Sequence, residues 1–164
     1  MNDIHLCAAL ANLLDAELKD FMLPLEHELN SEAVYRAPKI FQGYLPPKGK
    51  RQGNSGNDDD FPFVVIRPDG GETNSDGCSS DVTLIFGVWD ERFDGHLTAM
   101  TLKDRVEAIL LNLPNQVLAN RFILEMPISW ENSPTQAWPF WQIVMKTRWT
   151  FHRPGIVNPS KDYE

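Results

Sequence analysis

Imidazole nitrogens bind transition metals and exchange protons near neutral pH, so the histidines are the first residues to consider for chemistry. The chain has four of them, at His5, His27, His96 and His152. They lie far apart, and none is spaced with a cysteine, aspartate or glutamate as zinc ligands are. We interpret them as surface or half-buried side chains, and we expect no metal ion and no other cofactor.

Two acidic stretches offer oxygen atoms to a hard cation such as calcium. The first is the run Asp58–Asp60, and the second is residues 69–77, with the sequence DGGETNSDG. The second stretch lacks the alternating acidic ligands and the closing glutamate of a calcium-binding loop. We interpret it as a turn between two strands, and the first as a solvated acidic loop.

The remaining polar residues do not match a catalytic or nucleotide-binding motif. Asp90, Glu91 and Asp94 lie between a predicted strand and a predicted helix, where carboxylates commonly stabilise the helix N-terminus. No serine has the setting of a nucleophile elbow, and no glycine-rich stretch has the spacing of a phosphate-binding loop. We therefore expect no catalytic residue, and we expect that the protein is not an enzyme.

Aromatic residues are plentiful, with five Trp and nine Phe among 164 residues. Those near the ends of predicted strands are Phe61, Trp89, Trp130, Trp138, Trp141 and Trp149. We expect most of them in the hydrophobic core, where each buries a large area. The alternative is that some lie at a protein–protein interface, because Trp and Tyr are enriched at the centres of interfaces.

Charge and cysteine content restrict the partners. The net charge is −8 and the Lys and Arg residues are scattered, so we expect no specific nucleic acid partner. Two cysteines, Cys7 and Cys78, indicate no disulfide framework and fit a reducing compartment. No apolar run reaches the roughly 18 residues that cross a bilayer, and the N-terminus lacks a secretory pattern. We expect no membrane partner and synthesis in the cytoplasm.

Two segments with helical periodicity must position these residues. In residues 3–20 apolar side chains recur at steps of three and four, and Asp3 is placed to cap the N-terminus. A second helix is predicted over residues 95–112, and Pro114 terminates it. Its apolar stripe consists of Leu102, Val106, Ile109, Leu110 and Leu113.

Four segments have the composition of strands: 61–67, 81–89, 121–126 and 139–152. In the last of them one face consists of Trp141, Ile143, Met145, Trp149 and Phe151. Residues 30–47 are expected to be extended or irregular and to lie along the domain or a neighbour. Residues 48–60 and 69–79 are expected to be flexible loops, because they have almost no apolar anchor.

This order of elements predicts an α+β fold, with a four-stranded, mostly antiparallel sheet and two main helices packed on one face. Residues 1–153 form a single domain in this prediction. Residues 154–164 form a polar C-terminal tail.

Several blocks of sequence resemble proteins from the tail modules of long-tailed bacteriophages and prophages. The blocks are IFQGYLPP (40–47), DDFPFVVIRP (59–68), LKDRVEAILLNLP (102–114), NRFILEMPISWE (120–131) and WPFWQIVMKTRW (138–149). The resemblance extends over residues 33–153. Within that group the chain looks most like the tail terminator, or tail-completion, proteins, and the head–tail adaptor proteins are a neighbouring family.

The resemblance implies a structural protein of the virion tail or neck, without catalytic residues. Tail terminators form a hexameric ring on the last ring of the tail tube, stop its growth and present a surface to the head. The implied partners are further copies of the chain, the major tail tube protein and the head–tail connector protein. We expect ring closure through sheet edges and the final strand. Tyr35, Tyr44 and Trp130 are the predicted interface residues, as large side chains in irregular segments.

A function from another class stays open at this point. The chain would then be a small cytosolic enzyme or ligand-binding domain. Its pocket would be lined by tryptophan and by Arg67 or Arg148.

Overall fold

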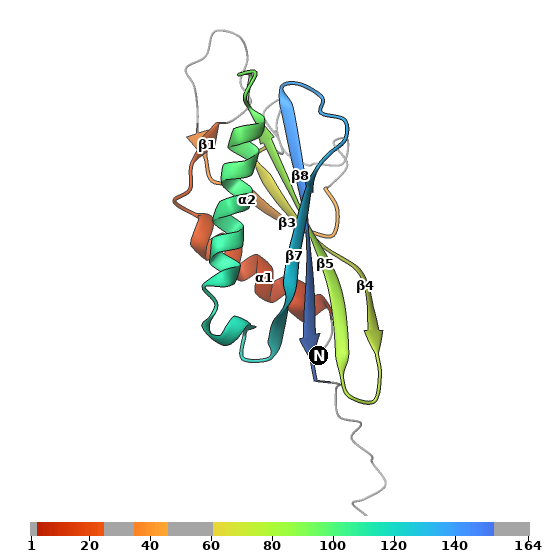
Figure 1. Cartoon of the computed structure of the whole chain (residues 1–164). Coiled ribbons are helices and arrows are strands. Elements are labelled where there is room, and N and C mark those ends of the chain that lie inside the picture. Colours follow the sequence, from red (N-terminus) through yellow and green to blue (C-terminus); the bar gives the residue numbers. More distant parts are fainter. Residues whose placement is uncertain (1–2, 25–34, 46–60, 153–164) are drawn as a thin grey trace, which may run out of the picture.

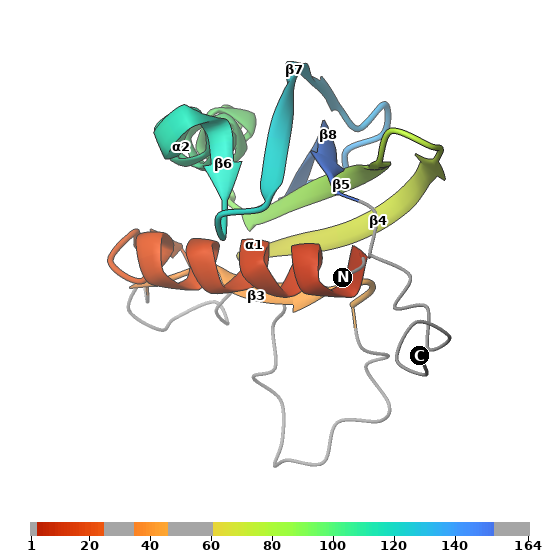
Figure 2. The ribbon, with the colours of Figure 1, turned by 90° about the horizontal axis from the view of Figure 1, so that it is seen from below.

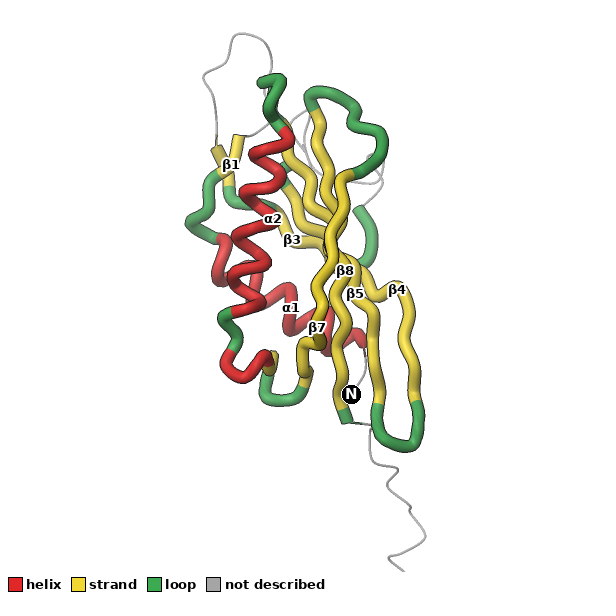
Figure 3. Tube along the Cα trace, in the orientation of Figure 1, coloured by secondary structure: helices red, strands yellow, loops and turns green. Residues whose placement is uncertain are grey.

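The computed structural model describes residues 3–24, 35–45 and 61–152, and Figure 1 shows the whole chain. The predicted loop 48–60 and the predicted tail 154–164 lie outside the described residues. In these described ranges two helices and eight strands follow one another, with a short 3₁₀ turn between α2 and β6. Figure 3 shows the helices and strands along the chain. They are α1 (Asp3–Leu18), β1 (Leu23–Pro24), β2 (Tyr35–Arg36), β3 (Lys39–Gln42), β4 (Phe63–Thr73), β5 (Cys78–Trp89), α2 (His96–Leu111), η2 (Pro114–Gln116), β6 (Val117–Leu118), β7 (Phe122–Asn132) and β8 (Phe140–Phe151).

Both predicted helices are confirmed, and each buries one stripe. In α1 a leucine recurs every fourth residue, which places four fully buried side chains on one face: Leu6, Leu10, Leu14 and Leu18. In α2 the buried apolar side chains are Ala99, Leu102, Val106 and Leu110. Helix α1 packs on β3 and β4, whereas α2 packs on β5 and β8. The two helices therefore share one hydrophobic core with the sheet.

The prediction of a four-stranded sheet is wrong, because the main sheet has six strands. Their order is β3-β4-β5-β8-β7-β6, and all neighbours are antiparallel except β3 and β4. The four predicted strands are all present, and β3 and β6 extend the sheet at its two edges. The longer sheet curls into a half-barrel around the helices (Figure 2). Strands β1 and β2 form a separate antiparallel pair.

Two strands run further than their sequences indicate. Residues 69–79, predicted to be a loop, instead form the end of β4, a short turn and the start of β5. The β4–β5 ladder continues to the pair Thr73 and Cys78, after a register shift between Pro68 and Gly70. Strand β7 likewise continues past Pro127, where a second register shift interrupts its pairing with β8. Each strand continues past a register shift, which a β-bulge accommodates, and the continued part lengthens the half-barrel.

Alternation along β5 and β8 separates a core face from an outer face. The apolar residues of β5 at even positions, from Val82 to Val88, enter the core. In β8 the predicted face is buried or half-buried, and Trp149 is completely buried. No helix in the described part of the chain is both long enough and apolar enough to span a membrane.

Candidate interaction surface

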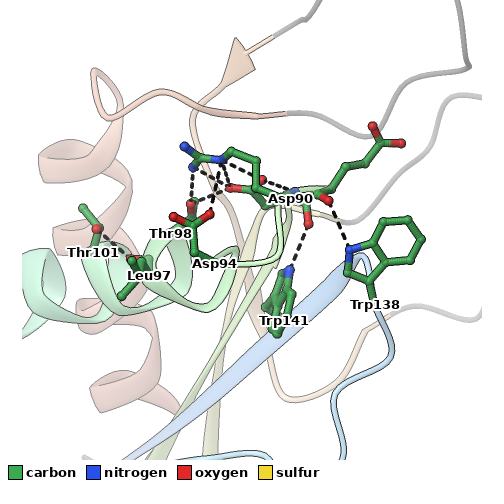
Figure 4. A network of polar contacts seen from close by, with 9 residues as sticks. Asp90, Asp94, Leu97, Thr98, Thr101, Trp138 and Trp141 are labelled. Atoms are coloured by element: carbon green, nitrogen blue, oxygen red, sulfur yellow. Dashed lines mark hydrogen bonds and ion pairs between the residues drawn. The ribbon is translucent and has the colours of Figure 1, made fainter.

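The connection between β5 and α2, residues 90–95, is organised around one buried carboxylate. The side chain of Asp90 is only 5% exposed. It accepts hydrogen bonds from the backbone N–H of Arg92 at 3.0 Å, from Arg92 Nη2 at 2.7 Å and from Thr98 Oγ1 at 2.7 Å (Figure 4). Arg92 Nε donates to the same carboxylate at 3.0 Å, so four donors fix the loop to the first turn of α2.

The same contacts keep this carboxyl group ionised. Burial raises the pKa of Asp90, but the hydrogen bonds from Arg92 and Thr98 outweigh burial and lower the pKa from the ordinary 3.8 to about 2. The partner cation responds in the opposite direction, because the hydrogen bond and charge of Asp90 raise the pKa of Arg92. The ion pair is therefore intact at neutral pH.

A second set of hydrogen bonds ties the loop to the β7–β8 connection. The indole Nε1 of Trp141 donates to the carbonyl oxygen of Asp90 at 2.9 Å, and Trp138 Nε1 donates to the carbonyl of Glu91 at 3.1 Å (Figure 4). The backbone N–H of Asp90 also donates to the carbonyl of Pro139 at 2.9 Å. Two loops that are distant in sequence thus form one hydrogen-bonded unit.

Gly95 permits the close approach of the Trp141 ring. A Cβ atom at residue 95 would lie 2.2 Å from Trp141 Nε1 and 2.8 Å from Cε2. Since Gly95 has a helical φ of −58°, its backbone does not demand glycine. The requirement for glycine here is purely steric.

The acidic residues of this loop do not cap the helix as the sequence predicted. Gly95 is the N-cap residue of α2, and no side chain caps this end of the helix. The backbone N–H of Leu97 donates to the carbonyl oxygen of Asp94 at 2.9 Å. Asp90 instead reaches the side chain of Thr98, and Asp94 lies 4.0 Å from Arg92 Nε. The carboxylates therefore organise the loop rather than the helix terminus.

The rigid loop presents apolar side chains to the outside. Phe93 is 94% exposed, Leu97 on the first turn of α2 is 51% exposed, and Trp138 is 57% exposed although its indole nitrogen is hydrogen-bonded. Tyr35 on β2 is also exposed. We refer to Phe93, Leu97 and Trp138 as the Phe93 surface.

The other two predicted interface residues lie elsewhere. Trp130 is in the regular strand β7 rather than an irregular segment, and its partly exposed ring lies 4.4 Å from the Nζ of Lys103. Lys103 is buried, yet its pKa is raised, because ion pairs with Asp104 and Glu107 outweigh the lowering by burial. Trp130 thus packs over α2 through a cation–π contact.

Tyr44 follows β3 and is exposed, with the guanidinium of Arg67 5.3 Å from the centre of its ring. Arg67 also forms an ion pair with Asp69 at 2.8 Å. None of the three predicted interface residues forms a hydrogen bond or ion pair within the Asp90 network. Phe93 and Leu97 were missed, although an apolar residue between Arg92 and Asp94 in a polar loop is a signal for an exposed contact residue.

Ring closure was expected to involve sheet edges and the final strand, but the final strand, β8, is not at an edge of the sheet. Strand β8 is hydrogen-bonded to β5 on one side and to β7 on the other. The edges of the sheet are β3 and the β6–β7 side. Beyond Ile123 no strand of the described residues pairs with the outer side of β7, so its edge is open as far as Asn132.

Arg148 lies on the outer face of the sheet rather than against a tryptophan. It borders two clefts of about 340 Å³ and 380 Å³, and neither is lined by tryptophan. Its guanidinium lies 3.5 Å from Glu72 and 3.8 Å from Asp81. Within the described ranges no three histidine, cysteine or acidic side chains are grouped so that they could hold a metal ion.

Comparisons with protein-family models and with curated protein sequences give no match for this chain. The function is therefore inferred from the surfaces just described and from the resemblance of its sequence blocks.

Proposed function

We propose that the protein is a structural component of virion assembly that acts as a tail terminator. In this role several copies close into a ring on the last ring of the tail tube, stop its growth and join it to the head–tail connector. The protein is synthesised in the bacterial cytoplasm and ends in the tail or neck of the virion. The proposal extends the resemblance of residues 33–153 to that family.

The observation that carries the proposal is the Phe93 surface. Its side chains are exposed, whereas the loop beneath them is held by Asp90 and by two indole hydrogen bonds. A surface that is already ordered loses little conformational entropy on binding, which favours association. Exposed aromatic residues beside a polar rim are typical of protein–protein contacts.

The charge of the chain supports the same role. A net charge of −8 lets a ring of several copies present acidic side chains to passing DNA. Such a lumen repels phosphate groups rather than retaining them. An assembly protein through which DNA moves benefits from this property.

The proposal is tested by deleting the gene from the genome that carries it and inspecting the released particles by electron microscopy. We expect tails of abnormal length, or tails that are not joined to heads. Complementation with a Phe93→Ser/Trp138→Ser chain fails to restore normal particles. Complementation with Ile4→Ser restores them, because Ile4 is an exposed apolar residue on α1, outside the Phe93 surface. Normal particles without the gene, or the absence of any tails in cells that carry it, would refute the proposal.

A further inference from the structure

We infer that Phe93 of one copy of the chain inserts into a groove between α1 and α2 of the next copy. The inference deepens the proposed function and rests on it, since it names the contact between neighbouring subunits of the ring. The groove has a volume of about 330 Å³. Its lining includes Leu13, Glu17, Arg105, Ile109, Leu113 and Pro114.

The groove has the size and lining to accept an aromatic side chain. Leu13 on α1 and Ile109 on α2 are half-buried and pack against the core, so their exposed sides form an apolar floor. Leu113 and Pro114 extend that floor beyond the end of α2. A volume of about 300 Å³ is the lower end of the range for pockets that enclose small molecules, so one phenyl ring fits.

Phe93 and the groove lie toward opposite ends of α2. Phe93 precedes the first residue of the helix, His96, whereas the groove reaches Pro114 beyond its last residue. A helix of 16 residues is about 24 Å long, so one subunit cannot fill its own groove with its own Phe93. Any contact between Phe93 and the groove therefore joins two different copies.

Each of the two features carries one basic and one acidic side chain. Phe93 is flanked by Arg92 and Asp94, whereas the groove carries Glu17 and Arg105. The side chains of Arg105 and Glu17 form no ion pair or hydrogen bond within the described part of the chain. The side chain of Asp94 is 59% exposed, and its Oδ1 lies 4.0 Å from Arg92 Nε, which is a long distance for an ion pair. In the orientation that we infer, Asp94 of one copy faces Arg105 of the next, while Arg92 keeps its ion pair with Asp90.

A contact between two different surfaces is heterologous, so it continues from copy to copy. It produces a closed ring when the rotation between neighbours returns to the start. A symmetric dimer, in contrast, would use one surface twice. The inferred contact thus has the geometry that a ring requires.

Sedimentation velocity across a concentration series up to about 1 mM tests the contact, because even associations with millimolar Kd are visible there. We expect the unmodified chain to form oligomers. Phe93→Ser, Asp94→Arg and Arg105→Asp each weaken association at least tenfold, while Ile4→Ser leaves it unchanged. The exchange variant Asp94→Arg/Arg105→Asp restores association. Circular dichroism checks that each variant is folded.

A mixing experiment tests the direction of the contact. The Phe93→Ser variant keeps its groove, and the Arg105→Asp variant keeps its Phe93, so an equimolar mixture forms dimers but no larger species.

A chain that stays monomeric at every concentration, or oligomers unaffected by Phe93→Ser and by the charge exchange, would overturn the inference. If the contact behaves as expected but deletion of the gene leaves particles normal, the proposed function fails and the contact stands. If deletion of the gene disrupts tails but Phe93→Ser does not alter the oligomers, the inferred contact fails and the proposed function stands.

Discussion

The indole Nε1 of Trp141 lies 2.9 Å from the carbonyl oxygen of Asp90 and donates a hydrogen bond to it, although 51 positions separate the two residues. Trp141 belongs to β8 and Asp90 follows β5, so the bond fastens the loop before α2 to the last strand of the sheet. The position of the Phe93 surface therefore depends on residues from two distant parts of the chain.

Gly95→Ala tests this arrangement directly. The added Cβ would overlap the Trp141 ring, so we expect a loss of about 1–3 kcal/mol in the free energy of unfolding, as for other overpacked sites. The measurement is urea denaturation followed by tryptophan fluorescence. Gly70→Ala is the control, because a Cβ there meets no atom within 4 Å. Equal stability of both variants would contradict the steric role of Gly95.

Asp90→Asn removes the charge that Arg92 and Thr98 hold in place. Because the pKa of Asp90 is lowered from 3.8 to about 2 in the folded chain, its ionised form stabilises the fold at neutral pH by about 2 kcal/mol. We expect the variant to be less stable by this order at pH 7, in urea denaturation. Asp94→Asn, in contrast, changes an exposed side chain 4.0 Å from Arg92 and has a much smaller effect.

The pH dependence of this difference follows from the lowered pKa. The stabilisation is complete above the unfolded pKa of about 3.8 and is lost as the pH falls through about 2, where the folded group also takes up a proton. The stability of the unmodified chain relative to Asp90→Asn should therefore decline over this acid range only. A difference that declined between pH 8 and pH 5 would exclude Asp90 as its source.

The contact between Lys103 and Trp130 is measurable by a double-mutant cycle. We expect Lys103→Met and Trp130→Leu to show a coupling energy of about 1 kcal/mol in urea denaturation, because the cation is buried against the ring. The matched cycle Arg67→Met and Tyr44→Leu tests a more exposed contact at 5.3 Å, for which about 0.5 kcal/mol is expected. Zero coupling in the first cycle would show that Trp130 packs there without a cation–π contribution.

The turn between β6 and β7 contains an alanine in an unfavourable conformation. Ala119 and Asn120 have φ of 52° and 58°, and Arg121 N–H donates to the Leu118 carbonyl at 3.1 Å. Positive φ at both central residues is what a type I′ turn requires, and alanine tolerates it poorly. Ala119→Gly should raise the midpoint of thermal unfolding, with a gain of about 0.5 kcal/mol. Asn120→Ala should lower the midpoint, and the opposite order would refute this account.

The helices were predictable because the spacing of apolar residues within each segment indicates both the helix and its buried face. In α1 a leucine at every fourth position places the apolar side chains on one face of the helix, and the apolar residues of α2 are spaced in a similar way. Such a pattern can be recognised without knowing what the helix packs against. The four central strands were predictable for the same reason, since β-branched and aromatic residues dominate their buried parts.

The additional strands depend on pairing that local sequence does not encode. Lys39–Gln42 becomes a strand because it lies parallel to Phe63–Ile66, and nothing in its four residues predicts that partner. Residues 69–73, with the sequence DGGET, have low strand propensity and are extended by their ladder with β5. Pro127 indicated the end of a strand, yet a register shift lets β7 resume after it.

The candidate surface was only partly predictable. The sequence places three carboxylates after β5, but it does not show that the Asp90 carboxylate accepts from Thr98 or that two indoles donate to the backbone carbonyls of this loop. The alternation of the last strand predicts that Trp141 shares a face with Ile143 and Met145, but its hydrogen bond to the Asp90 carbonyl depends on the tertiary fold. Exposure of Phe93 is likewise a property of the folded loop, not of its sequence alone.

The central position of β8 has a consequence for biosynthesis. All other described strands precede β8, yet it lies between β5 and β7, so a nascent chain cannot complete the sheet until Phe151 has left the ribosome. Until then β5 and β7 each expose an unpaired edge with strongly apolar residues. Contacts of such long sequence separation form slowly, and exposed edges of this kind lead to aggregation. Chains truncated before Phe140 should therefore accumulate as insoluble material in the producing cell, rather than as a smaller folded domain.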